Sequence, residues 1–308
     1  MKPLSWNRAL LWLAAGMALL AIVSIVGSLV DHREVGGVNL WIKPLKFALS
    51  IGIYSVSLAW VLELLHRPRL ARVVSIVSVL GLMAEVVIIV GTAAFGLTSH
   101  FNVSTPFHTA LWSIMAFSIV VVWMVALVVT FVLFRVDLGD PARPLAIRAG
   151  AIIAVVGMGL AFLMTSPSAQ QLATFEGIAG AHAVGVADGG PGLPLLGWST
   201  VAGDLRIPHF VGMHALQMLP LLIVAIELLA RRLPRLRDAR VRLRLVVIAV
   251  VTYVLTIGIL TWQALSAQSI VHPAGAILIA GLTVALGAIA ATLFTVTRRN
   301  LVEPAPLT

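Results

Sequence analysis

Histidine is the residue type with the widest chemical use in this chain of 308 residues, which contains eight histidines and no cysteine. Imidazole is the commonest metal ligand in proteins and titrates near neutral pH, whereas the lack of thiols excludes Cys-ligated zinc, iron–sulfur clusters and disulfides. We interpret His32 and His182 as interfacial residues. Candidate ligands of a cofactor are His108, His214, Gln217 and His272, and candidate ligands of a metal ion are His100 and His209.

Among the apolar segments, the one from Gly203 to Pro220 has the most polar residues, and it contains three of these candidates. His214 and Gln217 are three residues apart, so they share one face of a helix. His209 is five residues before His214 and is rotated by about 140° on a straight helix, so both cannot reach one metal ion. We therefore expect His214 to face a buried site and His209 to lie at its edge.

A second group of polar side chains consists of charges in or beside apolar segments. Glu85 lies within GLMAEVVIIVG, where a carboxylate indicates a proton or ion path, or a protonated group bonded to a neighbouring helix. Lys43 and Lys46 are two of only three lysines, and Asp204 and Arg206 precede the segment of His214. The lysines favour an anionic group nearby, although snorkelling to headgroups explains them almost as well.

The elements that must position these residues are membrane helices. The chain is 60% apolar and 11% charged, which excludes a soluble globular domain. Spans of about 20 apolar residues cross a bilayer. We predict an all-α integral membrane bundle with spans at about 9–30, 44–65, 73–95, 106–134, 146–165, 208–230, 245–264 and 274–296.

The basic residues predict the orientation of these spans. All but four of the 21 would lie on the side of the N-terminus, and the four exceptions are Arg33, Lys43, Lys46 and Arg206. The positive-inside rule then predicts that both termini lie on the cytoplasmic side of a bacterial inner membrane. We interpret the run Arg231–Arg244 as a topogenic anchor rather than a nucleic-acid or anionic-lipid site, so we expect the lipid bilayer as partner and no nucleic acid.

The spans that enter from outside share a pattern at their outer ends. Each begins near a proline, and each carries a lysine or histidine within two residues of it. The repeat hints at two four-helix halves, 1–140 and 141–308. We expect the long outer connection, 166–207, to cover an outward-facing pocket, and residues 168–182 to form a short helix on it.

The topology resembles that of haem A synthase, a family of bacterial membrane haem proteins. The resemblance rests on eight spans, the outer histidines His108, His214 and His272, and the segment LTWQALSAQS at 260–269. It implies that paired histidines on the even-numbered helices hold haem. The chain departs from the family where Lys46 replaces a histidine of the second helix and where Glu-x-x-His is absent. The motifs SHFNVSTPFH and GDLRIPHFVGMHALQ are also similar to those of an uncharacterised family of bacterial polytopic membrane proteins.

Three functions are compatible with these residues. The first is a redox protein that binds haem or copper through His214 with His272 or His108. The second is a transporter or channel for a small anionic solute, with Lys43, Lys46 and Arg206 attracting the anion and Glu85 coupling protons. The third is a membrane assembly factor whose outer loop binds a protein. No signature of a nucleotide-binding loop, a dinucleotide fold, a zinc protease or a serine hydrolase is present.

Overall fold

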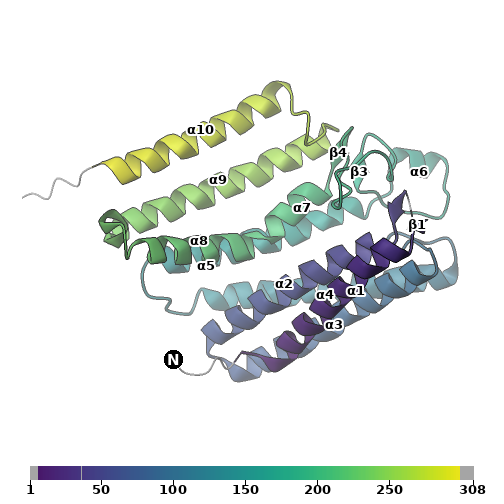
Figure 1. The fold of residues 1–308 in the computed structure, drawn as a ribbon, viewed down its shortest axis with the longest axis horizontal. Coiled ribbons are helices and arrows are strands. Elements are labelled where there is room, and N and C mark those ends of the chain that lie inside the picture. The colour runs from purple at the N-terminus through teal and green to yellow at the C-terminus, as the bar shows by residue number, and fades with distance from the viewer. Residues whose placement is uncertain (1–5, 36, 299–308) are drawn as a thin grey trace, which may run out of the picture.

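The protein is described by a computed structural model that covers residues 6–35 and 37–298. Its long helices run side by side between two ends (Figure 1). We call the end that carries the short strands and α6 the loop end, and the opposite end, which carries the turn between α8 and α9, the arginine end. The described elements are, in chain order, α1 (Arg8–Val30), β1 (Glu34–Val35), β2 (Val38–Asn39), α2 (Ile42–Leu65), α3 (Pro68–Ala94), α4 (Pro106–Leu133), α5 (Ala142–Gly159), the 3₁₀ helix Leu160–Met164, α6 (Ala169–Ala173), β3 (Ala183–Val184), β4 (Gly203–Asp204), α7 (Arg206–Met213), α8 (Ala215–Leu229), the 3₁₀ helix Pro234–Arg237, α9 (Ala239–Leu265) and α10 (Gly275–Thr297).

The helices are long and apolar enough to make this a multi-pass membrane protein. Seven described helices each suffice in length and composition to cross a membrane, and the pair α7 and α8 raises the number to eight if it forms one span. The prediction of an all-helical membrane bundle is confirmed in this respect. Among the described residues, the sheets are two short antiparallel strand pairs, β1 with β2 and β3 with β4.

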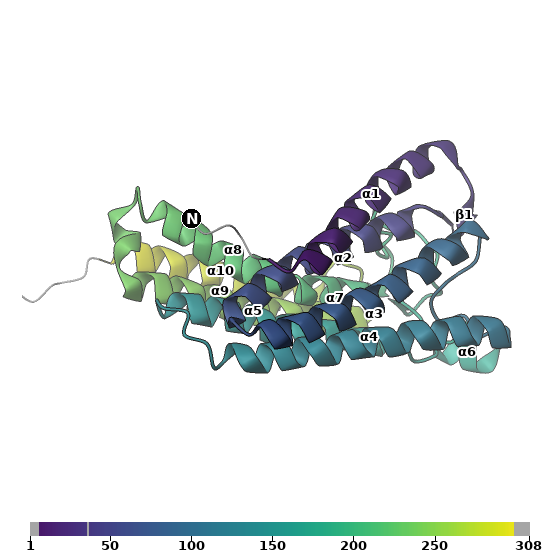
Figure 2. The same cartoon turned by 90° about the horizontal axis from the view of Figure 1, so that it is seen from below.

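Packing divides the bundle into two apolar cores that meet at α5. The first core joins α1 to α4 and includes Ile147 and Ala151 of α5. Figure 2 shows α3 and α4 lying side by side along their length, and the two helices are in contact. The second core joins α5, α8 and α9, and it includes Leu219 and Val246. The last helix, α10, lies outermost and packs on α9 (Figure 1).

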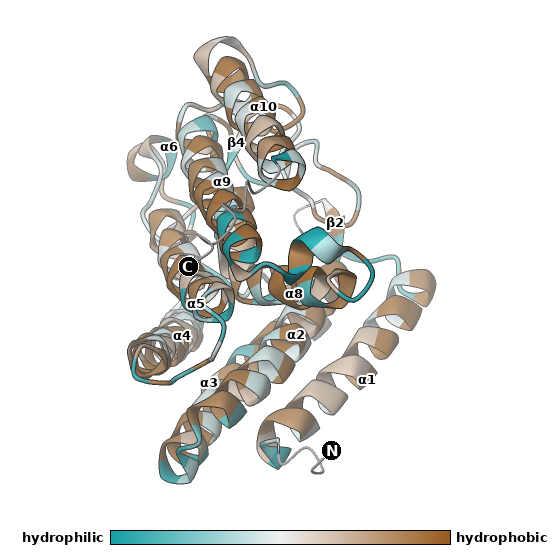
Figure 3. Ribbon diagram, turned by 90° about the vertical axis from the view of Figure 1, so that its left-hand side faces the viewer, coloured by the Kyte–Doolittle hydropathy of each residue, from teal (hydrophilic) through white to brown (hydrophobic). Residues whose placement is uncertain are grey.

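Several helices begin four to six residues earlier than the apolar pattern predicts. The expected starts at 73, 146 and 245 are Pro68, Ala142 and Ala239 in the structure. The apolar runs in the sequence stop at arginines, whereas the helices continue past them. An arginine in the first turns of a helix can keep its aliphatic stem against the helix and its guanidinium in water. Figure 3 shows hydrophilic residues gathered at the turn between α8 and α9, with hydrophobic helix walls behind them.

The sixth expected span, 208–230, is not straight. It consists of α7 and α8, which meet at an angle of 42°. His214 is the residue between them, and its backbone N–H donates to the carbonyl of Phe210 while its own carbonyl accepts from Gln217 and Met218. Pro220 lies in the second turn of α8, where it removes a backbone donor and its ring presses on the preceding turn. The 140° separation of His209 from His214 expected for a straight helix therefore does not apply.

Glycines let α5 approach this bend closely. A Cβ on Gly157 would lie 2.3 Å from the backbone of Gly212, and a Cβ on Gly150 would lie 2.8 Å from the carbonyl oxygen of Ala215. Close backbone contact through small residues is typical of packing between membrane helices. It holds the bent pair against α5 on both sides of His214.

The long connection, expected at 166–207, folds back over the loop end. Its short helix, α6, occupies Ala169–Ala173 of the 168–182 expected, and Ser168 and Gln171 form a capping box at its start. Strand β3 pairs with β4, and the backbone N–H of Ala179 donates to the carbonyl of Phe101. The segment thus joins the α3–α4 connection to the start of α7.

Candidate functional site

Charged and imidazole side chains from four segments meet at the loop end. They come from the start of α2, from the second half of α3, from the α3–α4 connection and from the long connection with the start of α7. We call this group the loop-end cluster, and it consists of Lys43, Lys46, Glu85, His100, His182, Asp188, Asp204 and Arg206.

A tight turn of the long connection, residues 193–198, rests on two cations of the cluster. Lys46 Nζ donates to the carbonyl of Leu196 at 3.0 Å, and Arg206 Nη2 donates to the carbonyl of Gly197 at 2.5 Å. Leu195 and Gly197 have φ values of 63° and 65°, a left-handed conformation that costs energy for a leucine. The turn therefore presents two successive carbonyls to two positive charges.

Arg206 also forms a buried ion pair with Asp204. Its Nε and Nη2 lie 2.9 and 2.5 Å from the two carboxylate oxygens of Asp204, whose side chain is fully buried. The carboxylate accepts two further hydrogen bonds from the backbone N–H groups of Ser199 and Arg206. Because this pairing is bidentate and fully satisfied, the charge of Arg206 is neutralised within the protein.

The two lysines differ from Arg206 because neither is paired with an acid. Lys46 is half-buried, and in the described part of the chain its hydrogen bond goes to the neutral carbonyl of Leu196. Lys43 is half-buried one turn earlier, and no hydrogen bond or ion pair holds its ammonium group among residues 6–35 and 37–298. The charges of Glu85, Lys46, Arg206 and Asp188 all act on it. The cluster therefore holds two ammonium groups that no carboxylate compensates directly.

Glu85 and His100 form the inner side of the cluster. His100 Nε2 lies 3.4 Å from Glu85 Oε1, and the other carboxylate oxygen of Glu85 is buried without a hydrogen-bond partner. The imidazole packs against three aromatic rings, with centroids 5.5 Å from Phe47, 5.9 Å from Phe101 and 5.6 Å from Trp112. Burial lowers the pKa of His100 well below its usual value, and the charges of Lys43 and His182 act in the same direction. His100 is therefore neutral at pH 7 and does not complete an ion pair with Glu85.

His182 and Asp188 form a second pair on the covering segment. His182 Nδ1 donates to Asp188 Oδ2 at 2.6 Å, and the backbone N–H groups of His182 and Ala183 donate to the same carboxylate. Burial alone would raise the pKa of Asp188, but the hydrogen bonds from His182 and Ala183 outweigh it and hold this pKa at about 2. The His182 ring packs on Phe101, with centroids 5.2 Å apart, so the pair connects the cover to His100.

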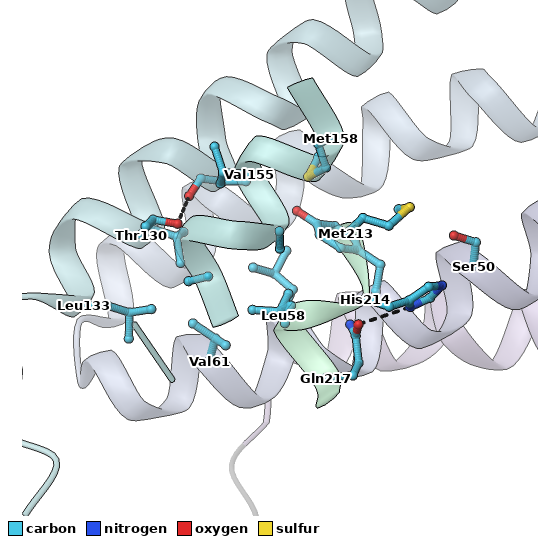
Figure 4. Close-up of a pocket in the computed structure, with 16 residues that line it drawn as sticks. Ser50, Leu58, Val61, Thr130, Leu133, Val155, Met158, Met213, His214 and Gln217 are labelled. Carbon is cyan, nitrogen blue, oxygen red and sulfur yellow. Dashed lines mark hydrogen bonds between the residues drawn. The ribbon is translucent and has the colours of Figure 1, made fainter. Parts of the chain in front are cut away.

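His209 and His214 lie deeper, beside α5. His209 Nδ1 donates to the carbonyl of Gly157 at 2.8 Å, and His214 Nδ1 donates to Gln217 Oε1 at 3.2 Å. The amide nitrogen of Gln217 in turn donates a hydrogen bond to the hydroxyl of Ser57 on α2 at 2.8 Å. Figure 4 shows His214 and Gln217 at one end of a group of residues that line a narrow cavity. The cavity lies between α2, α4, α5 and the bent pair of α7 and α8, and its volume is about 30 Å³. A cavity of this size holds about one water molecule.

His108 and His272 lie apart from His214. His108 Nδ1 is close to the hydroxyls of Ser104 and Thr105 at the start of α4, and His272 is exposed in the connection between α9 and α10. Within residues 6–35 and 37–298, no group of three or more histidines, aspartates and glutamates is placed to hold a metal ion. The arrangement gives no support to a shared ligand set of His214 with His272 or His108, which stays a prediction.

Two members of the cluster were not predicted as site residues: His182 was interpreted as interfacial but pairs with Asp188, and Asp188 was not considered. They lie six residues apart in a segment rich in glycine, where no periodicity indicates which side chains meet. Comparisons with protein-family models, curated proteins and solved structures find no match for the chain. The chemistry of the loop-end cluster therefore carries the functional proposal.

Proposed function

We propose that this multi-pass protein of a bacterial inner membrane binds a small anionic solute at its loop end and moves it across the bilayer. In this proposal α7 and α8 form one span, which makes eight, and both termini lie in the cytoplasm, so that the loop end faces outward. The placement of the basic residues supports the orientation, because Arg33, Lys43, Lys46 and Arg206 are the only ones near the loop end among the described residues.

The observation that carries the proposal is the pair of uncompensated ammonium groups, Lys43 and Lys46. A cation that is half-buried without an acid loses hydration and regains little from a neutral carbonyl. An incoming carboxylate or phosphate would give Lys43 a hydrogen-bond partner and would give both ammonium groups a negative charge to pair with, which a carbonyl cannot supply. Arg206 remains paired with Asp204 and holds the covering turn beside the anion.

Glu85 supplies the means of coupling in this proposal. Its carboxylate is buried, one of its oxygens has no hydrogen-bond partner, and the positive charge of Lys43 acts on it through space. When the anion binds Lys43, Glu85 loses that stabilisation and favours its protonated form. A buried carboxylate that gains a proton as the anion binds is the arrangement required for movement of a proton with the anion.

Calorimetry on the purified protein tests the binding step, with inorganic phosphate and succinate as probes and chloride as a reference. We expect one of the two probes to bind, and Lys43→Ala combined with Lys46→Ala to weaken its binding by at least tenfold. The matched control is Arg33→Ala, which removes a cation of the same end that is already paired with Asp31 at 2.7 Å. Absence of binding to the native protein, or equal binding by the double variant, would refute the proposal.

A second candidate function is the binding of haem or copper. His209 and His214 each use Nδ1 as a donor, to Gly157 and Gln217, which leaves Nε2 as the free ring nitrogen. Metal-binding histidines commonly donate their other nitrogen in this way. A Soret band or stoichiometric copper that is lost in His214→Ala would support this function, and a colourless, metal-free protein that binds an anion would exclude it.

A further inference from the structure

A long apolar groove lies between α8, α9 and α10, away from the loop-end cluster. Its volume is about 800 Å³, which is within the range of ligand pockets. Its walls are mostly leucine, isoleucine, valine and alanine, and they include Leu222, Leu245, Ile248, Ala288 and Val296. The groove exists because α10 packs on α9 and stands away from α8 (Figure 1).

The helices around this groove bury very little of themselves within the protein. Only 6% of the apolar window of α10 and 11% of that of α9 is buried, compared with 50% for α2. In a bilayer these surfaces are covered by lipid chains. The groove is thus a concave part of the lipid-facing surface, where the acyl chain of a lipid contacts the protein on several sides instead of one.

The length of the groove fits one leaflet. Along α9 its walls extend from Leu245 to Thr256, which is about 16 Å at the rise of ~1.5 Å per residue. Half of a hydrocarbon core of about 30 Å is about 15 Å. The groove therefore matches the depth of an acyl chain that enters from the arginine end and stops near the middle of the bilayer.

The distribution of polar groups gives the groove a direction. Deep in the groove, the hydroxyl of Tyr253 donates to the carbonyl of Val211 at 2.6 Å, so this hydroxyl is already used. Arg235 lines the groove near its other end, and its Nε donates to the carbonyl of Val296 at the end of α10 at 3.2 Å. The guanidinium also donates to the carbonyl of Arg298. An apolar interior with cations at one mouth is the pattern of a site for an amphiphile with a negative head.

The connection beside this mouth is strongly basic. Residues 231–244 contain seven arginines and a single acid, Asp238, and from the sequence alone we interpret them as a topogenic anchor; the groove beside them favours anionic lipid instead. Arg231 and Arg232 are exposed next to groove residues Leu229 and Leu233. Basic segments near the membrane surface attract anionic lipids.

We propose that the groove binds an anionic phospholipid of the leaflet at the arginine end. One acyl chain lies along α9 between α8 and α10, and the phosphate of the headgroup lies beside Arg231, Arg232 and Arg235. The lipid fills the space that separates α10 from α8 and so stabilises the position of α10. This site is independent of the anion site at the loop end, because no residue is common to both.

Native mass spectrometry of the purified full-length protein tests the site, with phosphatidylglycerol and phosphatidylcholine as probes. We expect one phosphatidylglycerol molecule to stay bound at collision energies that remove phosphatidylcholine. Arg231→Gln combined with Arg232→Gln should weaken this binding by about fivefold for each arginine. The matched control is Arg67→Gln combined with Arg69→Gln, which removes two exposed arginines of the same end at the start of α3 and should leave the bound lipid in place.

A substitution that fills the groove tests the acyl chain separately. Ala288→Trp places an indole in the groove and should abolish retention of the lipid, whereas Ala290→Trp on the opposite face of α10 should not. Circular dichroism confirms that both variants fold. Equal retention of the two lipids or retention in Ala288→Trp would overturn the proposal. Disulfide-linked dimers of the variant Ala288→Cys would also overturn it, because a second copy of the protein would then occupy the groove.

Discussion

Each end of the molecule has an arginine paired with a carboxylate, but one pair is exposed to water and the other is buried. At the arginine end, Arg143 pairs with Glu227 at 2.5 Å, and 51% of the arginine side chain is exposed. At the loop end, Arg206 pairs with Asp204 at the same distance, but 22% of the arginine and none of the aspartate is exposed. Water can replace either partner of the first pair, whereas only protein groups surround the second carboxylate. Equal geometry therefore has unequal consequences.

The partners of the remaining cations differ as well. At the arginine end, Arg242 pairs with Asp140, and several other arginines donate to carbonyls at helix ends, as where Arg148 donates to the carbonyls of Leu133, Phe134 and Val136 at the end of α4. Such contacts satisfy carbonyls that lack a partner in the helix and favour the negative end of the helix dipole. At the loop end, Lys46 donates to a covering turn, and Lys43 has no hydrogen-bond or ion-pair partner in the described part of the chain. The first arrangement anchors helices, and the second leaves binding capacity.

Among the substitutions that test this difference between the two ends, removal of the buried carboxylate of Asp204 should have the largest effect on stability. In Asp204→Asn, Arg206 stays partly buried without its counter-charge, and we expect the free energy of unfolding to fall by about 3–5 kcal/mol. The measurement is thermal unfolding of the purified protein in detergent. The control is Asp31→Asn, which removes the acid of the more exposed pair with Arg33 and should cost much less. Equal losses in the two variants would show that the cover does not exclude water.

Close backbone packing below the cluster should give the next largest effect. In Gly157→Ala, the new methyl group meets the backbone of Gly212 at 2.3 Å, so α7 must move away from α5. We expect a loss of about 1–3 kcal/mol. Gly159→Ala is the matched control, because its Cβ would approach the ring of Trp123 only to 3.8 Å. Unchanged stability in Gly157→Ala would show that α5 and α7 separate easily.

The pH dependence of stability should distinguish the two ends further. The pKa of His100 is lowered by burial, so the unfolded chain takes up a proton below about pH 6.5 that the folded protein does not. Stability should therefore decrease as the pH falls below this value, by up to about 1.4 kcal/mol per pH unit for one such group. Asp188, with a pKa of about 2, adds no slope at this pH, because its contribution is lost only well below pH 4.

Thermal unfolding between pH 5 and 7 measures this slope. His100→Gln should flatten it, because the buried imidazole is gone. His66→Gln is the control, since His66 is exposed at the opposite end of the bundle. A slope that stays the same in His100→Gln would assign the dependence to another group of the cover, in the first place His182, whose pKa burial also lowers.

The sequence predicts the membrane helices well because their apolar length must match the bilayer, which no tertiary contact can change. It also indicates Lys43, Lys46 and Glu85, since charges in such segments are conspicuous. It does not predict the bend at His214, which depends on contact of α7 and α8 with the glycines of α5. The pairing of His182 with Asp188 was missed for a similar reason, because it requires the long connection to fold across the loop end.

The smallest loss of stability is expected at the arginine end, for the exposed pair of Arg143 with Glu227, and it should be well below the loss expected for Asp204→Asn. Glu227→Gln keeps the shape of the side chain but removes its charge and one of the two oxygens that accept from Arg143 Nε and Nη2, at 2.5 and 2.9 Å. Because the arginine is half exposed, water and salt compensate, and we expect a loss of at most about 1 kcal/mol that vanishes at high salt. Thermal unfolding at low and high ionic strength measures it. A loss as large as that of Asp204→Asn would mean that exposure does not separate the two pairs, and the proposed contrast between anchoring and binding cations would then lack its physical basis.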